Sequence, residues 1–204
     1  DLFGEEWTVM FTDLSGFSRK VAEFGIIHFL QIISESERLY VPYINRHDGI
    51  LLKTDGDSLM VIFRKPVRAI ECAIEMQRAT RAYNVDKSDA EKMLLCVGLG
   101  FGRMLKIGDN DVFGSEVNAA SKLGEDTAKA WEILATGSSW KPCRGFRGFP
   151  SSLSRPSRRV LHRLIGSAIS CRVVGSAPCS RTFKTAIRPA PPDEDLANPA
   201  RSVS

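Results

Sequence analysis

GILLKTDGDSLMVIF, residues 49–63, has the pattern of a β-hairpin. Two apolar runs flank the dipeptide Asp55-Gly56, and such a dipeptide tolerates the positive φ of a tight two-residue turn. With that turn, Lys53 would face Ser58 on the opposite strand. Because successive side chains of a strand point to opposite faces, Lys53 and Asp57 would then lie on opposite sides of the pleat. The stretch therefore predicts two antiparallel strands and separates these two charged side chains.

Strand and helix patterns alternate on both sides of this hairpin. The predicted elements are a strand at 7–12, a helix at 18–44, the hairpin at 49–63, a helix from Pro66, a strand at 94–105, turn chemistry at 108–114, a helix from Ser115 and a strand at 132–136. The order β-α-β-β-α-β-α-β indicates an α+β fold with a ferredoxin-like βαββαβ core. We therefore expect a central, mainly antiparallel sheet flanked by helices.

Composition divides the chain into two regions. The 204 residues are 43% apolar and 25% charged, which suits one globular domain with an extension. Residues 1–140 hold 16 Lys and Arg against 21 Asp and Glu, whereas residues 141–204 hold 12 against 3, with 8 of the 10 prolines. We predict a folded domain at 1–140 and a basic Arg/Pro/Ser-rich tail at 141–204 with little structure of its own.

Several classes of protein are excluded by the same sequence. The longest apolar stretch, 25–33, is far shorter than the roughly 20 residues of a membrane-spanning helix, so no transmembrane segment is expected. Five cysteines without a C-x-x-C pair indicate neither a disulfide framework nor a zinc site, which favours the reducing cytoplasm. The tail's arginines lack a groove-reading motif and interleaved aromatic residues, so no nucleic acid partner is expected.

FTDLSGFS, residues 11–18, contains the first candidate for chemistry. Asp13 follows a predicted buried strand and precedes a helix start, where a carboxylate and free N–H groups suit a divalent cation beside a polyphosphate. Helix capping by Asp13 or Ser18 is the alternative interpretation. Asp57 is a second carboxylate of this kind, and two carboxylates that meet can hold two cations a few Å apart. The spacing leaves open whether they meet.

Three motifs together resemble the catalytic domain of class III nucleotidyl cyclases, the adenylate and guanylate cyclase family. They are FTDLSGFS, HDGILLKTDGDSLMVIF and DVFGSEVNAASKL, in this order. The resemblance runs from about Trp7 to Thr136, which is roughly two thirds of the chain. It implies that the domain at 1–140 is a nucleotidyl cyclase catalytic domain.

The resemblance implies a metal and phosphate site. Asp13 and Asp57 match the family's two metal-binding aspartates, which hold two Mg²⁺ or Mn²⁺ ions, and the backbone carbonyl of Leu14 is the additional ligand. The residues implied to lie under the triphosphate are Ser15, Gly16, Phe17 and Ser18.

The resemblance also implies a nucleoside site. Lys53 and Asp111 match the family's purine-reading lysine and aspartate. A Lys donor and an Asp acceptor complement the N1 acceptor and N6 donor of adenine, whereas guanine has the reverse order at these positions, so the pair favours ATP. Asn118 matches the asparagine that positions the ribose. Lys122 stands where the family usually has an arginine that neutralises the transition-state phosphate, and lysine lacks the planar fork.

The family forms its sites between two head-to-tail domains, so the resemblance implies a homodimer with two equivalent sites. The opposite pleat faces predicted for Lys53 and Asp57 agree with that arrangement. The predicted function is an adenylate cyclase that converts ATP to 3′,5′-cyclic AMP and pyrophosphate by a two-metal mechanism. The family continues after residue 136 with a helix and a strand pair that bears a phosphate-binding lysine, and the tail shows no counterpart, so the domain at 1–140 is C-terminally incomplete against the family pattern. The alternative is a cyclase-like regulatory module that binds nucleotide or a partner with little turnover, favoured by Lys122 and by this missing strand pair.

Overall fold

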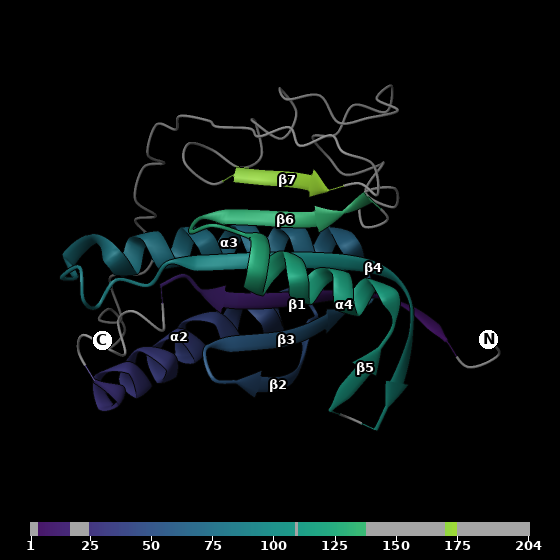
Figure 1. Ribbon diagram of the computed structural model, residues 1–204, viewed down its shortest axis with the longest axis horizontal. Helices are drawn as coiled ribbons and strands as arrows, with labels where there is room; N and C mark the ends of the chain where they lie inside the picture. The colour runs from purple at the N-terminus through teal and green to yellow at the C-terminus, as the bar shows by residue number, and fades with distance from the viewer. Residues whose placement is uncertain (1–3, 17–24, 109, 138–169, 175–204) are drawn as a thin grey trace, which may run out of the picture.

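The computed structural model describes residues 4–16, 25–108, 110–137 and 170–174 (Figure 1). The elements in chain order are β1 (Glu5–Leu14), α2 (Ile26–Arg46), β2 (Ile50–Asp55), β3 (Ser58–Phe63), α3 (Pro66–Tyr83), the 3-10 turn η1 (Asn84–Asp86), β4 (Leu95–Ile107), β5 (Asp111–Phe113), α4 (Ser115–Ser121), the π-helix η2 (Lys122–Thr127), β6 (Glu132–Thr136) and β7 (Ser170–Val174). None of the helices in these ranges is long and apolar enough to cross a membrane.

The strands of the described residues form one mixed sheet with the order β2-β3-β1-β4-β6-β7, and β5 pairs with β4 beside this path. The pairings β2·β3, β3·β1, β1·β4 and β4·β5 are antiparallel, whereas β4·β6 and β6·β7 are parallel. The predicted α+β fold, with a mainly antiparallel sheet flanked by helices, is confirmed.

Helices cover both faces of the sheet because the β1 side chains alternate between two apolar cores. Met10 packs with residues of α2 and α3, whereas Val9 and Phe11 pack with residues of α4. Figure 1 shows α4 in front of the sheet and α3 behind it. Residues 7–12 of β1 are all buried, and this part of the strand is mostly apolar because side chains on both of its faces enter a core.

The hairpin turn differs by one residue from the prediction. Asp55 pairs with Ser58, so the two turn residues are Gly56 and Asp57, and Gly56 supplies the positive φ of 58° at the first turn position. Because of this displacement, Lys53 pairs with Met60 instead of Ser58, and a bulge between Leu51 and Lys53 shifts the register again further along the strand. The predicted separation of Lys53 and Asp57 by the pleat is therefore wrong, because Asp57 belongs to the turn.

Three other parts of the chain differ from the sequence prediction or extend it. The predicted turn at 108–114 contains the short strand β5, in which Phe113 pairs with Leu105. The predicted tail contributes β7, a strand that the sequence analysis missed, parallel to β6. The predicted helix at 18–44 is described from Ile26, and residues 17–24 lie outside the described residues.

Candidate active site

Asp13 and Asp57 meet at one end of the sheet. Asp13 lies near the end of β1, and Asp57 lies in the turn that precedes β3; since β1 and β3 are paired, with Thr12 opposite Leu59, the two carboxylates come together. Their side chains share a hydrogen bond, and the Leu14 N–H lies 3.4 Å from Asp57 Oδ2. The question that the spacing left open is answered by this strand pairing.

The two carboxylates perturb each other. Burial, followed by the charge of Asp57 and a hydrogen bond to it, raises the pKa of Asp13 to about 7. Burial also raises the pKa of Asp57. The raised pKa values mean that negative charge on these two carboxylates is poorly compensated by the surrounding protein. Divalent cations fit the donor set, because they would supply the missing positive charge and prefer carboxylate oxygens.

Asp13 and Asp57 are the two carboxylates that meet at this end of the sheet. Among the described residues, no group of three or more His, Cys, Asp or Glu side chains could hold a metal ion. The remaining ligands would have to be backbone carbonyls, such as that of Leu14, together with water and phosphate oxygens.

The segment after β1 is only partly available to a phosphate. The Ser15 N–H donates a hydrogen bond to the Leu94 carbonyl at 2.8 Å, so this N–H group is already used. Gly16 has a φ of 83° and is exposed. Phe17 and Ser18, the other two residues predicted to contact the triphosphate, lie outside the described residues.

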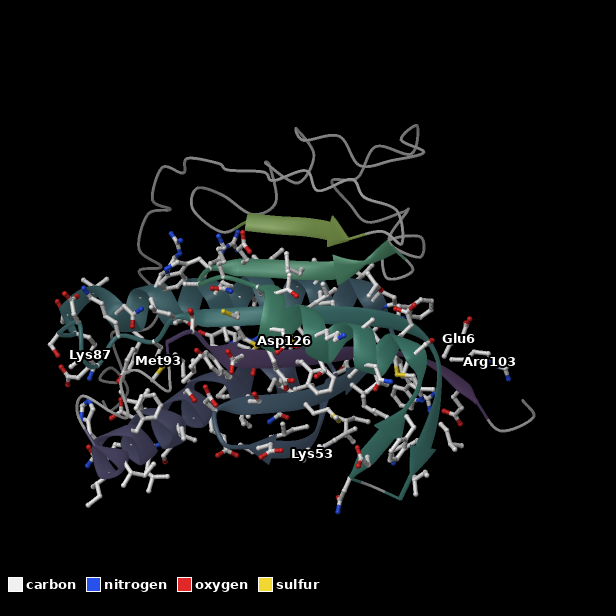
Figure 2. All side chains as sticks on the ribbon, viewed as in Figure 1. Glu6, Lys53, Lys87, Met93, Arg103 and Asp126 are labelled. Carbon is white, nitrogen blue, oxygen red and sulfur yellow. The ribbon has the colours of Figure 1, made fainter. Side chains whose placement is uncertain are left out.

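Lys53 and Asp111 meet beside an open pocket of about 290 Å³. Lys53 Nζ, on β2, lies 3.3 Å from Asp111 Oδ1, on β5, and the same oxygen accepts a hydrogen bond from the Val112 N–H at 3.1 Å. Figure 2 shows Lys53 at β2, on the side that faces β5. The two side chains are 42% and 40% exposed, so a ligand can reach both.

The pocket combines polar and apolar walls. Its lining residues are Phe11, Lys53, Asp55, Ser58, Met60, Asp111, Val112, Phe113, Val117, Asn118, Ser121 and Glu125. Three of the residues predicted to bind the nucleoside, Lys53, Asp111 and Asn118, are thus brought together. Lys122 is exposed at the start of η2 and is not one of the lining residues, whereas its neighbour Ser121 is.

The α4 and η2 helices, which form one wall of this pocket, lie very close to the sheet because the β4 residues that face them are glycines. A Cβ at Gly98 would collide with the Ala120 carbonyl oxygen and with the backbone of Gly124, and a Cβ at Gly100 would collide with the Glu116 carbonyl oxygen. Only glycine therefore permits the position of α4 and η2 that places Asn118 at the pocket.

Glu125 is a functional candidate that the sequence analysis missed. It lines the pocket, and its charge is one of the causes that raise the pKa of Asp13. Ser121 Oγ donates a hydrogen bond to Glu125 Oε2 at 2.6 Å. The available signal was the spacing of Ser121 and Glu125, because residues four apart on a helix are neighbours.

Comparisons with known proteins show which family the chain resembles. A family model described as the adenylate and guanylate cyclase catalytic domain matches residues 4–146. The serine/threonine-protein kinase pkn2 of Myxococcus xanthus is 28% identical over 129 residues, which are 63% of this chain and 15% of that protein. The putative adenylate cyclase 3 of Rhizobium meliloti (strain 1021) is 29% identical over 115 residues, which are 56% of this chain and 19% of that protein. The chain thus spans a small part of the length of both relatives.

Solved structures show the same fold. The guanylate cyclase domain of RhGC from Catenaria anguillulae, in complex with GTP, has a TM-score of 0.61 and 21% sequence identity, and the match covers 69% of this chain and 83% of that chain. The resemblance based on the three motifs is confirmed by the family model, which spans all of them. The chain therefore belongs to the adenylate and guanylate cyclase catalytic domain family.

Proposed function

We propose that this chain is an adenylate cyclase that converts ATP to 3′,5′-cyclic AMP and pyrophosphate. The observation that carries the proposal is the contact between Asp13 and Asp57, two carboxylates that come from different strands and share a hydrogen bond. A protein gains nothing in stability from two such carboxylates without compensating charge, so a ligand is the simplest reason for the arrangement.

Asp13, Asp57 and the Leu14 carbonyl would hold two divalent cations, Mg²⁺ or Mn²⁺. When bound, such cations lower the pKa of a ribose 3′-hydroxyl and neutralise a polyphosphate leaving group. The two carboxylates fix where that charge sits, and Ser15 to Ser18 would lie beside the polyphosphate. In-line attack of the 3′-oxygen on the α-phosphorus would form the cyclic phosphodiester and break the bond to pyrophosphate, and the hydroxyl proton would pass to water or to the departing pyrophosphate.

Lys53 and Asp111 supply the proposed base specificity. Their ion pair presents a donor next to an acceptor at the pocket wall, which matches N1 and the N6 amino group of adenine. The apolar residues Phe11, Met60 and Val117 around them suit a flat aromatic ring. Asn118, on the same wall, would orient the ribose.

A second copy of the chain is proposed to complete each site. Three apolar side chains on the arm formed by β4 and β5 are exposed beside the pocket: Leu105 by 43%, Ile107 by 55% and Phe113 by 53%. A partner that covers this surface would remove apolar area from water. The expected assembly is a homodimer, with metal-binding residues from one copy and purine-binding residues from the other.

The second candidate function is a regulatory module that binds nucleotide with little turnover. One observation favours it: Lys122 stands in place of the family's arginine. Its side chain is exposed and is not one of those that line the pocket. Such a module would bind ATP with a divalent cation but would release no cyclic product.

The experiment that tests the proposal measures cyclic AMP and cyclic GMP formed from ATP and GTP, with Mg²⁺ and separately with Mn²⁺, over a protein dilution series. Cyclic AMP whose specific rate falls on dilution is expected from a dimeric adenylate cyclase. ATP-dependent stabilisation without any cyclic product would instead favour the regulatory module. A preference for GTP would refute the role of Lys53 and Asp111.

A further inference from the structure

We infer that Glu125 is a positioning residue for the cations at Asp13 and Asp57: held by Ser121 against the end of β1, its carboxylate adds negative charge that strengthens divalent cation binding. The inference rests on the proposed cation site. Glu125 lies outside the three motifs that carry the family resemblance.

The first support is the close packing of η2 on the sheet. A Cβ at Gly124 would lie 2.9 Å from the Phe11 carbonyl oxygen and 3.0 Å from the Gly98 nitrogen, so this turn of helix rests directly on β1 and β4. Phe11 and Asp13 are two residues apart on one strand and share a face. Glu125 follows Gly124 on η2, which places it near the end of β1 that carries Asp13.

The second support is that the Glu125 side chain is held in place. Ser121 Oγ donates a hydrogen bond to Glu125 Oε2 at 2.6 Å. The intervening backbone is a π-helix, in which the Ala128 N–H donates to the Leu123 carbonyl at 2.8 Å, and single π-turns are frequent at functional sites. An exposed glutamate would otherwise sample many rotamers, so this bond fixes where the charge lies.

The third support is electrostatic. The charge of Glu125 contributes to the raised pKa of Asp13, which means that the two carboxylates interact. The role inferred for Glu125 is to act through its charge, or through water bound to the cation. Such an effect is screened by salt.

The chain offers a matched control for this inference. Asp126 is the next acidic residue of η2 and is exposed, and Figure 2 labels it on this helix. Asp126 is not one of the residues that line the pocket, nor one of those that shift the pKa of Asp13. Glu125→Gln and Asp126→Asn therefore remove the same charge from neighbouring positions, and Glu125→Asp keeps the charge.

The test measures the thermal unfolding midpoint of the full chain against MnCl₂ concentration, without nucleotide and at constant low ionic strength. The apparent dissociation constant follows from the dependence of the midpoint on cation concentration. Glu125→Gln should raise this constant about threefold to tenfold, the size expected from one nearby charge in a partly exposed site. Asp126→Asn should raise it by less than about twofold, and Glu125→Asp should remain near the original value. The difference should shrink in about 0.5 M NaCl.

Asp57→Asn separates this inference from the proposed function. If Asp57→Asn abolishes the stabilisation by Mn²⁺ but Glu125→Gln leaves the constant unchanged, the role of Glu125 is refuted and the cation site stands. If Asp57→Asn binds Mn²⁺ as tightly as the original chain, the proposed cation site is wrong, and the inference fails with it. Equal effects of Glu125→Gln and Asp126→Asn would overturn the specific position assigned to Glu125.

Discussion

Lys53 and Asp111 are 58 residues apart in the chain, yet their charged groups lie 3.3 Å from each other at the wall of the pocket. Neither partner is held by burial, since both side chains are about two fifths exposed. Surface ion pairs of this kind contribute little to stability. We therefore interpret the pair as a hydrogen-bond donor and acceptor for a ligand, and not as a contribution to the stability of the fold.

Lys53→Glu should reduce the preference for ATP over GTP. The substitution places a like charge beside Asp111 and removes the donor proposed for N1 of adenine. The ratio of kcat/KM for ATP to that for GTP should fall by about tenfold or more, the effect of losing one charged hydrogen bond. Lys65→Glu, at an exposed position outside the pocket lining, is the control. An unchanged ratio in Lys53→Glu would refute the purine-reading role.

Asp57→Asn should abolish cyclic AMP formation while the fold is retained. The amide has almost the same size as the carboxylate but loses the charge that a divalent cation needs. We expect a loss of about 100-fold or more in kcat, with an unfolding midpoint at or above that of the original chain in EDTA. The unfolding midpoint should not fall, because the substitution removes a half-buried charge that repels the carboxylate of Asp13. Substantial turnover in this variant would contradict the two-metal assignment.

The pH dependence of stability should report on Asp13. Burial and the charge of Asp57 raise its pKa from 3.8 to about 7, so the folded protein binds this proton more tightly than the unfolded chain. The resulting stabilisation is fully present below about pH 3.8 and is lost as the pH rises through about 7. In EDTA, the urea midpoint should therefore fall between about pH 5 and pH 8.

Asp13→Asn isolates this effect from the other titrating groups. The variant should show a smaller fall in the urea midpoint over the same pH range, because residue 13 no longer titrates. Saturating Mn²⁺ should oppose the fall in the original chain but not in the variant. Identical pH profiles for the two proteins would show that Asp13 does not carry the shift.

The sequence predicted the strands and helices well where a pattern repeats over many residues. Both faces of β1 and one face of α3 are buried, and such elements leave a clear periodic signal. The short strands leave no such periodic signal. The three residues of β5 are too few to show a period, and β7 (SCRVV) lacks an alternating pattern. The hairpin register changed because the turn is displaced by one residue and a bulge lies between Leu51 and Lys53, and side-chain patterns encode neither feature.

The candidate site shows the same division. Motifs identified Asp13 and Asp57, but their contact depends on the pairing of β1 with β3, a long-range register that local patterns leave open. The spacing of Ser121 and Glu125 pairs these two side chains, but it does not show which part of the sheet the π-helix packs against, so the relation of Glu125 to Asp13 was missed.

Gly98→Ala should damage both stability and activity. The added methyl group would collide with the Ala120 carbonyl and with the backbone at Gly124, and backbone cannot move aside as a flexible side chain can. We expect a loss of about 1–3 kcal/mol or more in the free energy of unfolding, measured by urea denaturation. Gly4→Ala is the control, because its Cβ would meet nothing closer than 3.5 Å. Equal stability of the two variants would contradict the close approach of α4 and η2 to β4.

Lys122→Arg distinguishes the two candidate functions. If the chain is an enzyme limited by lysine at this position, the planar fork of arginine should stabilise the transition-state phosphate better and raise kcat by about tenfold, with little change in KM. The exposed position of Lys122 at the start of η2 means that the longer side chain meets no packing penalty. Because the partner copy is proposed to supply the metal-binding residues, the gain should require protein concentrations at which the dimer forms. A variant that binds ATP as before and still yields no cyclic AMP would favour the regulatory module, since the departure at Lys122 would then have been repaired without effect.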